Sequence, residues 1–126
     1  MGRFAHNDVL DAALLLIKNN STRIVLCLAQ PTNFTEANSV YRLAAQPVTP
    51  ADFTIHDDET AGRQMNVAAK PGVPVTVQGV GNHTALLDVP NSRLLWVTPT
   101  SDTPVLAGGS VDLSSWEIEI GDPIAD

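Results

Sequence analysis

Residues 110–120 constrain the fold more than any other part of the chain. Apolar residues alternate there with polar ones, namely Val111, Leu113, Trp116, Ile118 and Ile120. Side chains of a strand point alternately to its two faces, so this pattern predicts a strand with one face in a core and one in water. The apolar positions change from odd to even numbers near Ser114 and Ser115. That change predicts a β-bulge, in which one extra residue restores the register.

Similar patterns recur along most of the chain. Further strands are predicted at residues 24–29, 40–45, 52–57, 64–69, 75–78, 83–89 and 93–98. Turns are predicted at 60–63, 70–74 and 90–92, and a polar loop at 100–109. Turn signals spaced about 8–12 residues apart are typical of a sandwich or barrel. Residues 24–29 are apolar at both odd and even positions, so that strand is expected to be central and covered on both faces.

One amphipathic helix is predicted near the N-terminus. Asn7 or Asp8 can cap it, and Asp8 and Asp11 place negative charge in its first turn, where the helix dipole favours it. Its apolar stripe consists of Val9, Leu10, Ala13, Leu14, Leu16 and Ile17. We expect the stripe to pack on the sheet around residues 24–29, although such a stripe also suits a partner protein. A second, short helical turn is expected to begin at Thr35.

These patterns together predict a mainly β fold. We expect residues 1–126 to form a single-domain antiparallel β-sandwich or barrel with one N-terminal amphipathic α-helix packed on it. A chain of 126 residues with 44% hydrophobic residues is long enough for one core. Residues 1–4 and 121–126 are expected to be short terminal arms.

The charge excludes several kinds of partner. The formal net charge is −7 at pH 7, which argues against binding to nucleic acid or to an anionic membrane surface. No stretch approaches the roughly 20 apolar residues of a membrane span. The N-terminus lacks the apolar region of a signal peptide, so we expect cytoplasmic synthesis. The one cysteine, Cys27, lies in an apolar run and is expected to be a buried, inert thiol.

Neither a metal site nor a cofactor site is expected. Asp57, Asp58 and Glu59 form an acidic run that can be imagined as a calcium site, but it lacks the spaced ligands and central glycine of an EF-hand loop. The three histidines, His6, His56 and His83, are far apart in the sequence and lack the spacing of zinc ligands.

The remaining candidates also favour structural roles. The glycines at 79 and 81 precede a strand, whereas a phosphate-binding loop needs a helix N-terminus. Trp96 and Trp116 suggest a carbohydrate platform, but both alternate with aliphatic residues as core side chains do. A small hydrolase would need a pair of carboxylates, for which Asp57 and Asp88 are the candidates. Nothing else in the sequence favours a hydrolase. We therefore predict no catalytic residue and no enzyme activity.

The order of segments resembles a family of small structural proteins from the virions of tailed bacteriophages. The segments that carry the resemblance are 4–13, 23–27, 30–32, 34–37, 62–63, 79–88, 94–98, 108–109 and 116–123. They span most of the chain and consist mainly of apolar and turn residues.

The resemblance implies a structural component of the particle and not an enzyme. A capsid decoration or cement protein is the first interpretation, and a head–tail or tail-surface component is the alternative. A carbohydrate- or cell-surface-binding module is a further alternative. The implied partners are the phage major capsid protein or other virion proteins, together with further copies of the chain in a homo-oligomer. The implied location is the virion, assembled in the host cytoplasm.

Overall fold

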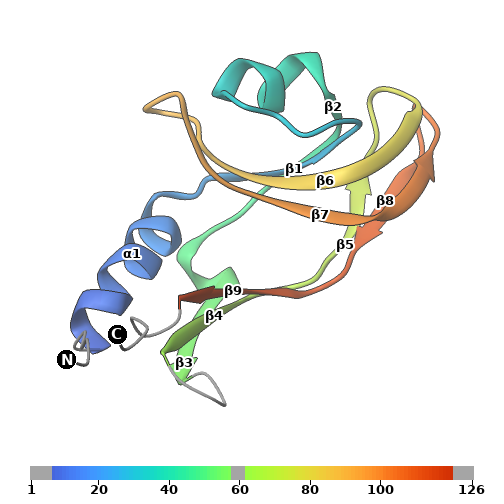
Figure 1. Ribbon diagram of the computed structural model, residues 1–126. Helices are drawn as coiled ribbons and strands as arrows, with labels where there is room; N and C mark the ends of the chain where they lie inside the picture. The colour runs from blue at the N-terminus through green and yellow to red at the C-terminus, as the bar shows by residue number, and fades with distance from the viewer. Residues whose placement is uncertain (1–6, 58–61, 121–126) are drawn as a thin grey trace, which may run out of the picture.

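The structure, a computed structural model, describes residues 7–57 and 62–120, and Figure 1 shows the arrangement of its elements. The helical elements are α1 (Asn7–Asn20), the π-helical turn η1 (Glu36–Val40) and the 3-10 turn η2 (Pro50–Asp52). The strands are β1 (Arg23–Cys27), β2 (Arg42–Pro47), β3 (Phe53–Asp57), β4 (Arg63–Val67), β5 (Lys70–Pro74), β6 (Gly79–Asp88), β7 (Arg93–Val105), β8 (Ser110–Leu113) and β9 (Trp116–Ile120). The predicted terminal arms and the acidic residues 58 and 59 lie outside the described residues.

The strands form three antiparallel sheets. Sheet A has the order β2-β1-β6-β7, sheet B the order β3-β4-β9, and sheet C pairs β5 with β8. Figure 1 shows sheet A as one layer, with β3, β4 and β9 in a second layer. The larger core contains side chains from all three sheets and from α1. The predicted mainly β, antiparallel fold with one N-terminal helix is therefore confirmed.

Strand β1 is central in sheet A and is buried on both faces. It pairs with β2 on one side and with β6 on the other. Ile24 and Leu26 point into the larger core, whereas Val25 and Cys27 belong to a smaller core on the opposite face. The prediction of a strand covered on both faces is confirmed. The second face is covered by the segment around η1, including Ala37, and not by α1.

Helix α1 lies at one end of the molecule. Its contacts are with β4 and β3 of sheet B, with β6 of sheet A and with η2. The expected packing on the sheet around β1 is therefore confirmed only in part: Leu14 and Ile17 share the larger core with Ile24, but sheet B is the main partner of the helix. Asp11 accepts a hydrogen bond from Arg63 Nε at 2.7 Å, which ties α1 to β4. Of the predicted stripe, Leu14 and Ile17 are buried, whereas Val9 and Leu16 are exposed. The helix touches the body through a narrower strip than its periodicity suggested, because it closes the end between two sheets.

The strand predicted over 110–120 is divided into β8 and β9. Val67 pairs with Trp116 and Lys70 with Leu113, so the pairing register is the same on both sides of the division. The expected bulge at Ser114 and Ser115 is therefore wrong. Instead, the partner strand is also interrupted, at Ala68 and Ala69 between β4 and β5, directly opposite Ser114 and Ser115. Both strands change the face that they bury at this point. A bulge does occur across the ladder, where Pro71 and Gly72 of β5 lie opposite Asp112 alone.

Two other segments differ from prediction because prolines were taken as breaks. Residues 70–74, predicted as a turn, form β5, while 75–78, predicted as a strand, contain only an isolated bridge from Val75 to Ala44. Residues 100–105, predicted as loop, extend β7. Both β5 and β7 are edge strands, where proline is tolerated because one side of the strand has no ladder partner. The turn at 90–92 and the helical turn after Thr35 are confirmed.

Truncation of Leu14 tests whether α1 is part of the fold. The Leu14 side chain is fully buried, so Leu14→Ala removes buried methyl groups and leaves a cavity. We expect the free energy of unfolding to fall by about 2–5 kcal/mol, measured by urea denaturation. The matched control is the neighbouring Leu15→Ala, since Leu15 is 42% exposed. Equal effects of the two substitutions would contradict the described packing of α1.

Candidate functional site

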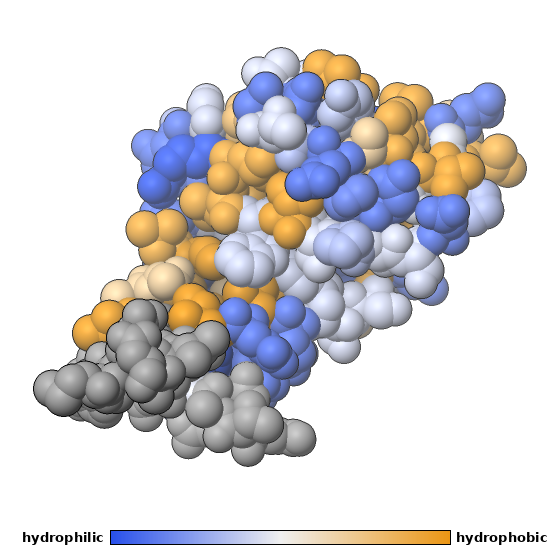
Figure 2. All heavy atoms as spheres, in the orientation of Figure 1, coloured by the Kyte–Doolittle hydropathy of each residue, from blue (hydrophilic) through white to orange (hydrophobic). Residues whose placement is uncertain are grey.

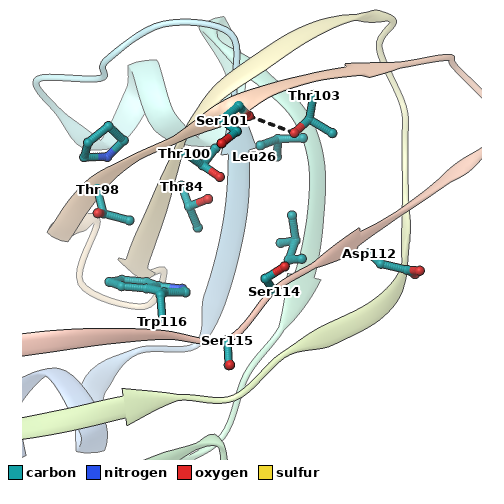
Figure 3. Close-up of a pocket in the computed structure, with 12 residues that line it drawn as sticks. Leu26, Thr84, Thr98, Thr100, Ser101, Thr103, Asp112, Ser114, Ser115 and Trp116 are labelled. Atoms are coloured by element: carbon teal, nitrogen blue, oxygen red, sulfur yellow. Dashed lines mark hydrogen bonds between the residues drawn. The ribbon is translucent and has the colours of Figure 1, made fainter.

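A hollow of about 340 Å³ opens between β7 and the β8–β9 connection. Its walls are formed by Leu26, Thr84, Thr98, Pro99, Thr100, Ser101, Thr103, Asp112, Leu113, Ser114, Ser115 and Trp116. We call it the hydroxyl pocket, because most of these residues are threonine or serine. Figure 3 shows residues of β7 on one side and the indole of Trp116 on the other.

Two irregularities in the strands create the hydroxyl pocket. Gly81 pairs with Thr103 and His83 pairs with Pro99, so three residues of β7, 100–102, lie opposite Asn82 alone. This enlarged bulge bends β7 and changes the direction of its side chains. Across the pocket, the interruption between β8 and β9 supplies the opposite wall. The sandwich is therefore incompletely closed along the β7 edge.

The floor of the pocket is a row of side chains on three paired strands. Leu26 pairs with Thr84, and Thr84 pairs with Thr98, so these three share the inner face of sheet A. Thr84 is only 5% exposed. Gly81 lets Leu26 occupy its position, because a Cβ atom on residue 81 would lie 2.5 Å from Leu26 Cγ. The regular pairing of these strands holds the floor in place.

The pocket is polar but uncharged over most of its surface. Its lining includes no lysine, arginine or histidine. The Asp112 carboxylate accepts a hydrogen bond from Gly72 N at 2.8 Å and points away from the hollow in Figure 3. Thr103 Oγ1 donates to Ser101 O at 2.9 Å. Trp116 Nε1 is buried and has no hydrogen-bond partner among the described residues. The pocket can therefore exchange hydrogen bonds with a ligand.

A second candidate site is the outer side of α1. Among the described side chains of this helix, five apolar residues are exposed, namely Val9, Ala12, Ala13, Leu15 and Leu16. Val9 is 64% exposed and Leu16 is 45% exposed. The charged Asp11, in contrast, is turned toward Arg63. We call this surface the α1 face. Figure 2 shows hydrophobic residues gathered at this end of the molecule.

His56 and His83 lie in different parts of the described structure, whereas the side chains of the acidic run 57–59 are not described. Among residues 7–57 and 62–120, no group of three or more His, Cys, Asp or Glu side chains is placed to hold a metal ion. His56 Nε2 lies 3.6 Å from Glu117 Oε2 on the outer face of sheet B. His83 Nδ1 lies 2.6 Å from Asn82 Oδ1, and His6 falls outside the described residues.

The other sequence candidates take the structural positions expected of them. The glycines at 79 and 81 begin strand β6 and precede no helix. Trp96 and Trp116 are both partly buried and pack against the larger core, and Trp116 also lines the hydroxyl pocket. Thr100 and Thr103 of the pocket escaped prediction because residues 100–109 were expected to be a loop. A serine- and threonine-rich run beside Pro99 was the one available signal.

Asp88 is paired within its own hairpin, and the side chain of Asp57 is not described. Asp88 is 2% exposed, and its carboxylate accepts hydrogen bonds from Asn91 Nδ2 at 2.9 Å and from Arg93 Nη2 at 2.8 Å. The Asn91 side chain and the Arg93 guanidinium hold the pKa of Asp88 below its ordinary value. The carboxylate therefore stabilises the β6–β7 turn.

This pairing predicts a pH dependence of stability. A carboxylate with a lowered folded-state pKa stabilises the protein above its unfolded pKa, and that contribution is lost as the pH falls through the folded pKa. Asp88→Asn should lower the free energy of unfolding at pH 7, and the difference from wild type should shrink below about pH 4. The control is Asp102→Asn in the exposed bulge of β7. A pH-independent effect of Asp88→Asn, measured by urea denaturation, would argue against the charged pairing.

Cys27 is a buried free thiol, as the sequence predicted. Cys27 is fully buried, and burial raises the pKa of its thiol to about 12. Since only the thiolate reacts, labelling of the native protein by an aromatic disulfide reagent at pH 8 should be at least about 100-fold slower than labelling in urea. Labelling at the same rate in both conditions would show that the smaller core opens freely.

Comparison with protein-family models, with curated proteins and with solved structures gave no match for this chain. In the described part of the chain, no helix is long and apolar enough to cross a membrane.

Proposed function

We propose that the protein is a non-enzymatic structural component of a bacteriophage virion, most specifically a decoration or cement protein of the capsid. It attaches in many copies to the major capsid protein and stabilises the shell. The sequence resemblance supplies the virion context. The attachment role rests on the α1 face. The outer side of a surface helix normally bears charged or polar residues, whereas the outer side of α1 is apolar.

The α1 face suits contact with another protein. Exposed single apolar residues are common, but several adjacent ones on a helix mark an interaction surface. Helix α1 is also fixed to the body by buried Leu14 and by the pairing of Asp11 with Arg63. A helix held in this way loses little conformational freedom when its outer side is covered, which favours binding.

A second exposed apolar group lies at the other end of the molecule. Val77, Val80 and Leu106 are 48%, 47% and 73% exposed. In Figure 1 the β6 and β7 ends that carry this region lie far from α1. A cement protein joins neighbouring capsid subunits, so it needs contacts at separate points on its surface. Two apolar ends fit that requirement, and the same surfaces allow assembly into a homo-oligomer.

The alternative is a head–tail or tail-surface component, which would use the same α1 face on a different virion protein. The acidic net charge suits either location, since it keeps the free subunit soluble and directs it toward less acidic surfaces. The two locations differ in what the loss of the protein does to the particle.

The test is binding of variants to capsids that lack the protein. Leu16→Ser should leave the unfolding midpoint nearly unchanged, because the side chain is exposed, but weaken attachment about tenfold or more. The matched control is Leu28→Ser, since Leu28 is 40% exposed on a different surface. Cosedimentation measures attachment, and capsid release of DNA on heating measures stabilisation.

The outcomes separate the hypotheses. The cement role predicts that capsids without the protein form normally but break at lower temperature, and that Leu16→Ser fails to restore them. Capsids of unchanged stability that fail to attach tails would favour the head–tail alternative. Equal binding of Leu16→Ser and Leu28→Ser would reject the α1 face as the attachment surface.

A further inference from the structure

The hydroxyl pocket contains polar groups that have no partner in the protein. Within residues 7–57 and 62–120, the hydroxyls of Thr84, Thr98 and Thr100 form no hydrogen bond. Trp116 Nε1 is likewise without a partner, although it is buried. Buried polar groups are nearly always hydrogen-bonded, so an unpaired group beside a hollow indicates a missing partner. We propose that the hydroxyl pocket binds a neutral saccharide through one hexose or N-acetylhexosamine unit.

The charge of the pocket selects an uncharged ligand. The lining offers no cationic side chain to an anion, and the chain as a whole carries a net charge of −7. A divalent cation would need several carboxylates, whereas Asp112 is alone and is held by Gly72 N. Serine and threonine hydroxyls both donate and accept hydrogen bonds, as sugar hydroxyls do. The complementary ligand is therefore neutral and polyhydroxylated.

The shape of the pocket suits a sugar ring. Figure 3 shows the Trp116 indole across from the hydroxyls of Thr84 and Thr100. A pyranose has an apolar C–H face that packs on an aromatic ring while its hydroxyl groups hydrogen-bond at the other side. A volume of about 340 Å³ lies near the lower end of ligand pockets, which run from about 300 to 1,000 Å³. The pocket thus accommodates one sugar unit.

The position of the pocket allows the sugar to belong to a longer chain. Strand β7 is the last strand of sheet A, so the pocket lies at an open edge of the sandwich. Thr84 and Thr98 are held by regular strand pairing, which fixes the floor before a ligand arrives. The proposal does not rest on the virion role. It is compatible with a particle-bound protein that touches host polysaccharide, and equally with binding of a free sugar.

Titrations followed by two-dimensional amide NMR test the proposal. The probes are the methyl glycosides of glucose, galactose, mannose and N-acetylglucosamine. We expect at least one to cause saturable shifts of the Trp116 indole N–H and of the backbone amides of Thr98 and residues 100–103. Thr84→Val and Thr100→Val keep the side-chain shape but remove a hydroxyl, so each should weaken binding about threefold to tenfold. Thr100 is exposed, so its variant tests binding even if Thr84→Val fails to fold.

The matched control is Ser115→Ala. Ser115 also lines the pocket, but its hydroxyl points away from the hollow in Figure 3, so Ser115→Ala should change the affinity by less than about twofold. The proposal fails if no glycoside gives saturable shifts, or if Thr100→Val and Ser115→Ala behave alike. It also fails if inorganic phosphate or calcium chloride shifts the same resonances more strongly. An oligosaccharide of the preferred sugar that binds more tightly than the monomer would identify a polysaccharide as the source.

Discussion

Strand β1 must be shielded from water on both faces, and this requirement organises the rest of the molecule. Ile24, Val25, Leu26 and Cys27 are each at most 1% exposed. Burial of apolar surface is the main favourable term in folding, so a strand with two apolar faces needs two separate covers. Sheets B and C supply one cover, and the segment with η1 supplies the other. Helix α1 is then free to close the end of the sandwich, where its outer side stays exposed.

Elements with a simple apolar period could be predicted from the sequence. The alternation around Ile118 and Met65 places both residues on the inner face of sheet B, and the helix over Asn7–Asn20 has the expected extent. Burial of Cys27 followed from its apolar neighbours. In each of these cases the local sequence pattern and the tertiary packing favour the same structure, so the element can be predicted from the local sequence alone.

Features that depend on pairing between distant strands could not be predicted. The change of face at Ser114 looked like a one-strand bulge because the partner strand, interrupted at Ala68 and Ala69, was unknown. Pro71 and Pro104 are compatible with strands because β5 and β7 lie at sheet edges. Whether a strand lies at an edge depends on the order of the whole sheet, which the local sequence does not show. The hydroxyl pocket needs both the bulge of β7 and the interruption opposite it. Its residues come from five strands and a connection, so no contiguous sequence motif predicts it.

The α1 face and the hydroxyl pocket are the two separate surfaces that we propose for association. The α1 face is apolar and suits a lasting contact with another protein, whereas the pocket is polar and open at the edge of sheet A. Electron cryomicroscopy of intact particles tests the central claim, attachment through α1, most directly. We predict density for this chain at a fixed, symmetric number of copies, with the α1 face turned toward a neighbouring virion protein. Particles that lack such density, or in which α1 faces solvent in every copy, would contradict it.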